Sequence, residues 1–394
     1  MKNVALIVYS LEGGGAERVT STLSQELAKR HNLYVVVFSS DDIAYDFGGE
    51  LIDLNLKSRP SLPGKLFNLL LRTLSLRRVK KKLKLDCSIS LMESANLPNV
   101  LSRRKERVII SFHSSRLARR LWDPSRKADW IVGVSKDLSK KLIEDLDMPV
   151  AKVRTIYNPI DVDYLQSCSV TESGHLSALG TGGEGLVIAT MGRLTHAKGH
   201  WHLIRAMTRV KEAIPDVVLS IFGEGELRSY LSKLIEQLQL EDTVHLFGYQ
   251  SNPFMYVKNA GIFVLPSLYE GFSMVLCEAM ALGVPVIATD CKSGPREILD
   301  PNGRFDGPLD SMEFAEYGLL IPTCDGTRYD ASQALTKEET ILAESVIELA
   351  SNAVLRQEYS ERGKMRASHF DVKHIAKKWE ALMEADPPSG VFIV

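Results

Sequence analysis

The sequence is poor in cysteine and offers no arrangement that would bind zinc or build a disulfide framework. Its five cysteines are scattered through 394 residues, and no two of them form a C-x-x-C pair. An odd, dispersed set of cysteines is typical of a protein in a reducing compartment. The sequence also lacks an uninterrupted apolar run near the ~20 residues that a membrane-spanning helix requires. Residues 1–9 are too short for a signal peptide, and we interpret them as a first strand.

The chain has almost no net charge, but its charges are unevenly distributed. The formal net charge is −1, yet residues 1–160 contain 28 Lys and Arg against 17 Asp and Glu. Residues 161–394 contain the remaining 20 basic and 32 acidic residues. In a chain of this length the split favours two domains with different partners, and the basic half is expected to meet something anionic.

Short apolar runs alternate with helical patterns, which indicates an α/β protein built on parallel sheets. Strands are expected at 4–9, 33–38, 87–91, 108–111, 130–134 and 153–157, and then at 186–191, 217–222, 244–247, 261–265 and 284–288. We therefore predict two doubly wound, Rossmann-like domains at 1–163 and 186–371, with a linker at 164–185. Ligands of such sheets bind at the carboxyl ends of the strands.

The most informative segment begins with two glutamates eight residues apart, Glu270 and Glu278. Gly271 allows the backbone to approach a ligand, and residues 272–275 are predicted to form the first turn of a helix. Glu278 falls on the next turn, so both carboxylates can face one site. A bare pair of glutamates would equally suit a solvated helix N-terminus. With helix donors between them, the carboxylates predict a site for a polyhydroxylated, phosphate-bearing molecule such as a sugar nucleotide.

This segment closely resembles the signature of the retaining glycosyltransferases of family 4, which have the GT-B fold. The match includes the E-G-F start at Glu270 and the E-A-M-A-x-G-x-P-V-I-A run from Glu278 to Ala288. The resemblance covers nearly the whole chain and is strongest at 190–300. It implies two domains facing a central cleft, with acceptor binding by the first and nucleotide-sugar binding by the second. It also implies a C-terminal helix, expected at 372–386, that crosses back to the first domain.

Several loops match the family pattern and supply the remaining predicted site residues. The glycines at 13–15 are contiguous, which disfavours the G-x-G-x-x-G dinucleotide pattern, and the resemblance implies that they approach donor phosphates. In the segment 191–199, two basic side chains suit a diphosphate leaving group. His113 ends a predicted strand, where the resemblance implies contact with the transferred sugar or phosphate. The predicted catalytic residues are His113, Arg193, Lys198 and Glu270; the predicted donor-binding residues also include Gly14, Gly15, Gly192, Gly223, Gly248, Gly271, Phe272, Ser273 and Glu278.

No metal or other cofactor is predicted. Asp161-Val-Asp163 and Asp145-Leu-Asp147 look like the D-x-D metal motif of another transferase fold, but the first lies at the domain junction and the second ends a helical pattern. His196 and His200 are four residues apart, and no third ligand is evident.

Residues 57–84 contain ten Lys and Arg and no acidic residue. Helical spacing relates Leu66, Leu69, Leu70, Thr73, Leu74 and Arg77, and other basic residues lie on other faces. A basic amphipathic helix at about 65–84 can lie on an anionic membrane surface; alternatively, its apolar stripe packs on the domain core. Nucleic-acid binding is not predicted because the helix lacks interleaved aromatic residues. We expect acceptor binding by Glu17, Arg77, Arg78, Lys81 and Lys82, although Glu17 would also suit the first turn of an exposed helix.

The sequence thus predicts a retaining, metal-independent transferase that moves a hexose or N-acetylhexosamine from a nucleotide sugar, with UDP as the expected nucleotide. Its acceptor is expected to be a polyprenyl-pyrophosphate-linked glycan, and its location the cytoplasmic face of a membrane. Segments at 14–17, 293–295 and 316–320 resemble transferases that extend lipid-linked oligosaccharides with N-acetylgalactosamine. The alternatives are a GT-B-fold sugar-nucleotide epimerase or hydrolase, an NAD-dependent enzyme and a non-catalytic membrane-binding scaffold.

Overall fold

A computed structural model describes residues 1–41, 43–58, 61–114, 124–169, 185–303 and 307–388. The chain divides into two compact units. Unit 1 comprises Met1–Ile160 and Phe370–Val394, and unit 2 comprises Asp161–His369. The predicted linker at 164–185 lies mostly outside the described residues, and residues 164–168 belong to a helix of unit 2 instead.

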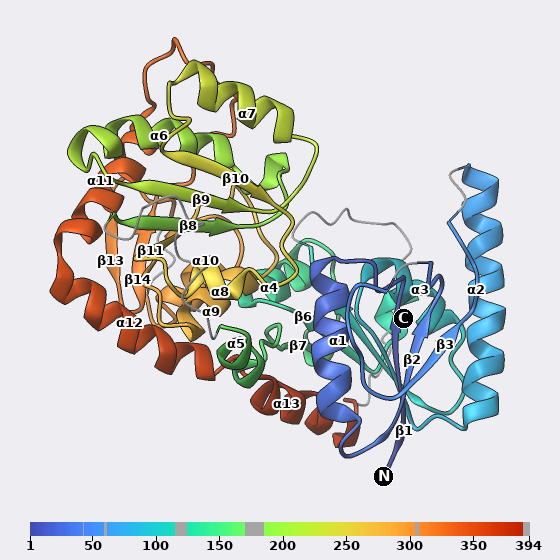
Figure 1. The fold of residues 1–394 in the computed structure, drawn as a ribbon. Coiled ribbons are helices and arrows are strands. Elements are labelled where there is room, and N and C mark those ends of the chain that lie inside the picture. The colour runs from blue at the N-terminus through green and yellow to red at the C-terminus, as the bar shows by residue number, and fades with distance from the viewer. Residues whose placement is uncertain (42, 59–60, 115–123, 170–184, 304–306, 389–394) are drawn as a thin grey trace. The chain divides into compact units, whose positions relative to one another are not determined.

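Unit 1 contains a seven-stranded parallel sheet in the order β3-β2-β1-β4-β5-β6-β7 (Figure 1). Its strands are β1 (Asn3–Val8), β2 (Asn32–Val37), β3 (Glu50–Asp53), β4 (Cys87–Ser90), β5 (Arg107–Phe112), β6 (Trp130–Gly133) and β7 (Val153–Thr155). Its helices are α1 (Gly15–Leu27), α2 (Leu62–Leu83), α3 (Glu93–Leu101), α4 (Lys136–Glu144) and α13 (Val372–Glu384).

Alternation along β1 explains how both faces of this sheet are covered. Val4 and Leu6 pack with α1 and with Trp379 of α13. Ala5 and Ile7 point to the opposite face, where they pack in one cluster with Leu76 of α2. All four strand residues are fully buried, as expected for a central strand of a doubly wound sheet.

Unit 2 contains a second seven-stranded sheet in the order β10-β9-β8-β11-β12-β14-β13, in which only β13 runs antiparallel to its neighbour. Its strands are β8 (Val187–Met191), β9 (Val218–Phe222), β10 (Val244–Gly248), β11 (Ile262–Leu265), β12 (Val286–Thr289), β13 (Glu313–Ala315) and β14 (Gly318–Ile321). Its helices are α5 (Val162–Cys168), α6 (His200–Ala213), α7 (Arg228–Gln237), α8 (Phe254–Val257), α9 (Met274–Ala281), α10 (Pro295–Leu299), α11 (Lys337–Ser351) and α12 (Ala353–Ser368).

The predicted α/β class with two doubly wound, Rossmann-like domains is confirmed. Three short strands, β3, β13 and β14, were not predicted. β3 and β13 lie at sheet edges and are only partly buried, so their sequences carry no continuous apolar run. Among the described residues, no helix is both long enough and apolar enough to cross a membrane.

Candidate functional site

Loops at the carboxyl ends of three neighbouring strands in unit 2 are joined by backbone hydrogen bonds. These loops are residues 192–199 after β8, 266–273 after β11 and 290–294 after β12. The N–H of Leu268 donates to the carbonyl of Ala197 (2.8 Å), and the N–H of Glu270 donates to the carbonyl of Lys292 (2.9 Å). The fold therefore brings segments that are far apart in sequence to one edge of the sheet, where such proteins bind ligands.

Lys198 and Glu270, both predicted catalytic residues, form an ion pair across these loops. Lys198 Nζ lies 2.6 Å from Glu270 Oε1, although the residues are 72 positions apart. The hydroxyl of Ser267 donates to the same oxygen at 2.7 Å. The side chain of Glu270 is 9% exposed, so the pair is more shielded from solvent than a surface ion pair. Among the described residues Glu270 Oε2 accepts no hydrogen bond, which leaves this oxygen for a ligand hydroxyl.

Glu278 and Ser273 lie on the helix that follows this loop. Glu278 is a residue of α9 and is only 1% exposed. Ser273 is the N-cap of α9, yet its buried hydroxyl makes no hydrogen bond to any described residue. The positive end of a helix dipole with a hydroxyl that has no partner can bind a phosphate or sugar oxygen.

Arg193 is the second cation of the loop after β8. Its side chain is exposed, and among the described residues it makes no hydrogen bond or ion pair. Lys198 in contrast is already paired with Glu270. A guanidinium without a protein partner can form a bidentate contact with a phosphate without breaking a contact in unit 2.

Gly223, one of the predicted donor-binding glycines, has a local packing reason as well. A Cβ on Gly223 would lie 2.0 Å from the carbonyl oxygen of Gly192, and the φ angle of Gly223 is +141°. Its N–H donates to the carbonyl of Gly248 at 2.8 Å. Close packing of the loops after β8, β9 and β10 therefore suffices to require glycine at 223. Ligand contact by these glycines, and by Gly271 and Phe272, remains a prediction.

The glycine loop of unit 1 leads directly into α1. Gly13 has a φ of +122°, Gly14 is the N-cap and Gly15 is the first helical residue. A Cβ on Gly15 would meet no atom within 4 Å, and a Cβ on Gly14 would meet only the flexible carboxylate of Glu17. Packing does not demand glycine at 14 and 15, which favours the prediction that a ligand approaches there.

His113 directly follows β5 in unit 1. Its Nε2 lies 2.8 Å from the hydroxyl oxygen of Ser111. Its backbone N–H and that of Ser114 both donate to Glu93 Oε1, at 3.1 and 3.2 Å. Burial lowers the pKa of His113 to about 4, so the imidazole is neutral at pH 7.

The buried side of helix α2 contains two basic side chains, whereas four of its leucines are exposed. Asn68, Arg72, Leu76 and Lys80 are its buried residues. Lys80 is 3% exposed and lies 2.8 Å from Glu106, while Arg72 donates to the carbonyl of Leu56 at 3.0 Å. Burial lowers the pKa of Lys80 to about 8, and Glu106 opposes that shift.

The alternative in which the apolar stripe of α2 packs on the core is wrong for most of this stripe, because its leucines are exposed. Leu62, Leu66, Leu70 and Leu74 recur every fourth residue and are 78%, 70%, 55% and 43% exposed. The next turns carry the predicted acceptor residues Arg77, Arg78, Lys81 and Lys82, which are all exposed. Lys80, in contrast, is a buried structural residue, because its ammonium group satisfies Glu106 and Asn99 inside unit 1.

Two family models match this sequence. The model described as Glycosyltransferase Family 4 matches residues 13–164, and the model described as Glycosyl transferases group 1 matches residues 177–321. Together the two models match most of the residues of both units. Both models describe glycosyltransferases, and the chain is a glycosyltransferase.

Two relatives agree with this assignment, and a solved structure has the same fold. An uncharacterized glycosyltransferase of Methanocaldococcus jannaschii is 37% identical over 64% of this chain and 63% of its own length. The N-acetylgalactosamine-N,N'-diacetylbacillosaminyl-diphospho-undecaprenol 4-alpha-N-acetylgalactosaminyltransferase of Campylobacter jejuni is 29% identical over 96% of this chain and 98% of its own length. The structure of Anabaena HepE in complex with UDP matches with a TM-score of 0.72 and 18% identity, over 96% of this chain and 98% of that chain. The structural match shows that this glycosyltransferase has the GT-B fold.

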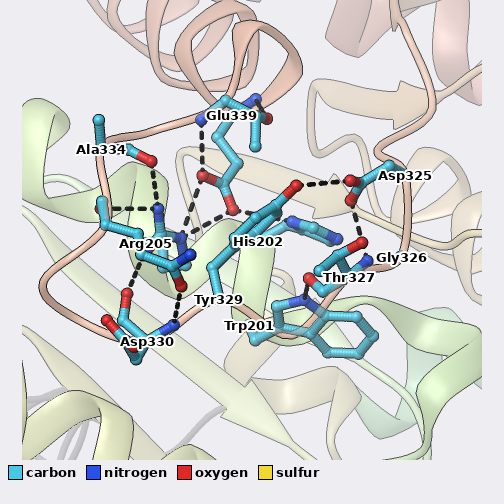
Figure 2. A network of polar contacts seen from close by, with 12 residues as sticks. Trp201, His202, Arg205, Asp325, Gly326, Thr327, Tyr329, Asp330, Ala334 and Glu339 are labelled. Atoms are coloured by element: carbon cyan, nitrogen blue, oxygen red, sulfur yellow. Dashed lines mark hydrogen bonds and ion pairs between the residues drawn. The ribbon is translucent and has the colours of Figure 1, made fainter.

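A buried polar network holds the loop after β14 of this glycosyltransferase against α6 (Figure 2). Arg205 Nη2 donates to the carbonyls of Gln333 (3.1 Å) and Ala334 (2.8 Å), and its Nε donates to Glu339. His202 Nδ1 lies 2.8 Å from Glu339 Oε1. Burial disfavours ionisation of Glu339, yet the hydrogen bonds from His202 and Arg205 hold its pKa below the usual value.

The same loop reaches the segment that carries Arg193 and Lys198. His196 Nε2 lies 3.0 Å from the carbonyl oxygen of Gly326, and Trp201 Nε1 donates to the carbonyl of Thr327 at 2.9 Å. The network therefore braces the loop after β8 from outside the candidate site. Ser267, Glu93 and the Arg205 network were missed in the sequence because none belongs to a recognised motif.

Proposed function

We propose that this glycosyltransferase moves a hexose or N-acetylhexosamine from a UDP-sugar onto a polyprenyl-pyrophosphate-linked glycan, with retention of configuration. The observation that carries the proposal is the set of groups at one edge of unit 2. The Lys198–Glu270 ion pair, the exposed Arg193, the N-terminus of α9 and the buried Glu278 lie on loops and a helix that are joined there. The HepE structure contains UDP, and the name of the Campylobacter relative specifies a diphospho-undecaprenol acceptor; both support the proposal.

Each group has a role that its position supports. Arg193 and Lys198 neutralise the diphosphate as the bond between the anomeric carbon and the phosphate oxygen breaks. Ser273 and the first turn of α9 donate hydrogen bonds to the donor. Glu278 accepts hydrogen bonds from the ribose, and Glu270 accepts one from the transferred sugar through Oε2. Two cations at the leaving group support a reaction without a metal ion.

Retention is proposed to follow front-face attack. Glu270 is already paired with Lys198 and bonded to Ser267, which makes it a poor covalent nucleophile. The acceptor hydroxyl oxygen bonds to the anomeric carbon on the face that the diphosphate leaves. The electron pair of the broken bond goes to the leaving phosphate oxygen, and that diphosphate takes the proton of the acceptor.

We propose that α2 places unit 1 on an anionic membrane at the cytoplasmic face. The leucine side of its first turns can enter the apolar boundary of the bilayer, and Arg77, Arg78, Lys81 and Lys82 can contact anionic headgroups. Each such basic residue contributes about 1 kcal/mol near an anionic surface. Glu17 and the four basic residues remain our candidates for acceptor binding.

Replacing Arg77, Arg78, Lys81 and Lys82 with glutamine is expected to release the protein from anionic liposomes in a sedimentation assay. Lys80 stays unchanged because its loss would leave Glu106 buried without its cation. Transfer to a long-chain lipid acceptor should slow more than transfer to a short soluble analogue, and high salt should weaken liposome binding of the unaltered protein.

The matched control removes four exposed cations of unit 2, Arg209, Lys233, Lys258 and Lys337. The control changes net charge equally and should keep liposome binding. If both quadruple variants bind liposomes as the unaltered protein does, α2 is a solvated helix and the membrane role is wrong.

A further inference from the structure

A buried arginine joins the loop after β12 to the edge strand β13. Arg296 lies on α10 and is only 6% exposed. Its Nε and Nη2 donate to Asp290 Oδ1 and Oδ2, each at 2.9 Å, in a bidentate pair. Its Nη1 donates to Glu313 Oε1 at 3.0 Å, and its Nη2 donates to Glu313 Oε2 at 3.3 Å. One guanidinium therefore connects the first residue after β12 with the first residue of β13.

The pair of Asp290 and Arg296 closes the loop of residues 290–294. Asp290 is the first residue of this loop, and α10, which contains Arg296, begins directly after the loop. The N–H of Asp290 donates to the carbonyl of Ile321 on β14 at 2.7 Å. The loop cannot open at its base without separating two charged side chains that are 7% and 11% exposed.

This closed loop holds the backbone of Glu270 in both directions. The N–H of Glu270 donates to the carbonyl of Lys292 at 2.9 Å, and the N–H of Ser293 donates to the carbonyl of Glu270 at 3.0 Å. The carboxylate of the same Glu270 lies 2.6 Å from Lys198 Nζ. The position of this carboxylate therefore depends on a loop that Arg296 closes.

The two carboxylates around Arg296 differ in their surroundings. Burial alone would lower the pKa of Arg296, but its hydrogen bonds to Asp290 and Glu313 raise that pKa above the usual value. The guanidinium is therefore a cation near pH 7. The side chain of Glu313 is 34% exposed and that of Asp290 is 11% exposed, so Glu313 is the outer partner. Either carboxylate can be neutralised while the other keeps the cation paired.

We propose that Arg296 is a positioning residue for glycosyl transfer, because through Asp290 and the loop 290–294 it sets the place of the Glu270 carboxylate beside Lys198. The holding of the loop concerns the protein alone, whereas the effect on transfer rests on the proposed function. The two parts therefore have separate readouts.

Hydrogen–deuterium exchange with mass spectrometry of peptides that cover 266–273 and 290–294 tests the first part. Asp290→Asn replaces one carboxylate with an amide of the same shape and leaves Arg296 paired with Glu313. Exchange in both peptides should be faster than in the unaltered protein. Glu313→Gln is the matched control, since it makes the same chemical change to the outer carboxylate, and its exchange in these peptides should stay close to that of the unaltered protein.

Arg296→Lys tests the same contact without neutralising a carboxylate, so it also serves if Asp290→Asn does not fold. Lysine keeps the charge but lacks the planar fork, and exchange in the two peptides should again be faster. Unchanged exchange in these variants overturns the proposal. Equal increases in Asp290→Asn and Glu313→Gln overturn it as well, because the loop would then depend on the stability of the whole cluster.

The transfer assay tests the second part. Asp290→Asn should lower kcat roughly tenfold with little change in UDP affinity, because a small displacement of a group at the reacting centre is costly in rate. Glu313→Gln should transfer at close to the normal rate. Adding Asp290→Asn to Glu270→Gln should cause no further loss, because the effect of Asp290 passes through Glu270.

Losses of kcat that multiply in the double variant would overturn the positioning role and leave Arg296 with a purely structural one. If the unaltered protein turns over no substrate, the proposed function fails, while the exchange experiment still decides whether Arg296 holds the loop.

Discussion

Arg193→Ala is expected to lower the rate of glycosyl transfer about a hundredfold or more, with little change in thermal stability. The guanidinium is exposed and makes no hydrogen bond or ion pair with a described residue, so its removal leaves no buried group unsatisfied. Removing this guanidinium should raise the energy of the transition state, in which negative charge develops on the leaving diphosphate. Initial rates at saturating donor and acceptor, together with a thermal melt, measure both effects.

Two further variants separate this role from a general effect of charge. Arg193→Lys keeps the charge but loses the planar fork, so an intermediate rate is expected. Arg209→Ala removes an exposed arginine of the same unit that pairs with Glu344, and it should transfer at the normal rate. Activity of Arg193→Ala within a few-fold of the unaltered protein would remove Arg193 from the site.

Replacing each of the two glutamates of the motif with glutamine is expected to change a different parameter, kcat for one and UDP affinity for the other. Glu270→Gln should lower kcat about a hundredfold and change UDP affinity little, because we place Glu270 on the transferred sugar. Glu278→Gln should mainly weaken UDP binding, because we place its buried carboxylate on the ribose. Calorimetric titration with UDP and initial rates measure the two parameters separately.

Ser267→Ala is a graded control for Glu270. It removes one hydrogen bond to Oε1 but leaves the Lys198 ion pair in place, so its kcat should fall less than that of Glu270→Gln. If both glutamine variants change UDP affinity and kcat by the same factors, the two roles are misassigned.

The regular parts of the fold could be predicted from sequence because their apolar runs are continuous. β1, β8 and β11 are almost wholly buried, and their sequences show this directly. β3 and β13 could not be predicted in the same way, since edge strands are short and partly exposed. Helix α5 overlaps the start of the predicted linker. Asp161 caps this helix by accepting the N–H of Tyr164, a local signal that the nearby glycine-rich stretch obscured.

The sequence names candidate site residues one by one, but it does not give their arrangement. The motifs contain Lys198 and Glu270, yet only the folded chain shows that they form an ion pair and that Ser267 completes it. For the basic helix, the sequence does not show which basic residues are buried. Composition alone groups Arg72 and Lys80 with Arg77 and Arg78, whereas packing buries the first two and exposes the others.

The most direct test of the proposed transfer is mass spectrometry of products formed from a panel of UDP-sugars and lipid-pyrophosphate-linked glycans. We expect the lipid-linked glycan to gain the mass of a hexose or N-acetylhexosamine only when donor and acceptor are both present, with no loss of rate in EDTA. Consumption of the donor without acceptor would indicate an epimerase or hydrolase instead. An acceptor that stays unchanged with every donor would contradict the account, and strong inhibition by EDTA would contradict its metal-independent mechanism.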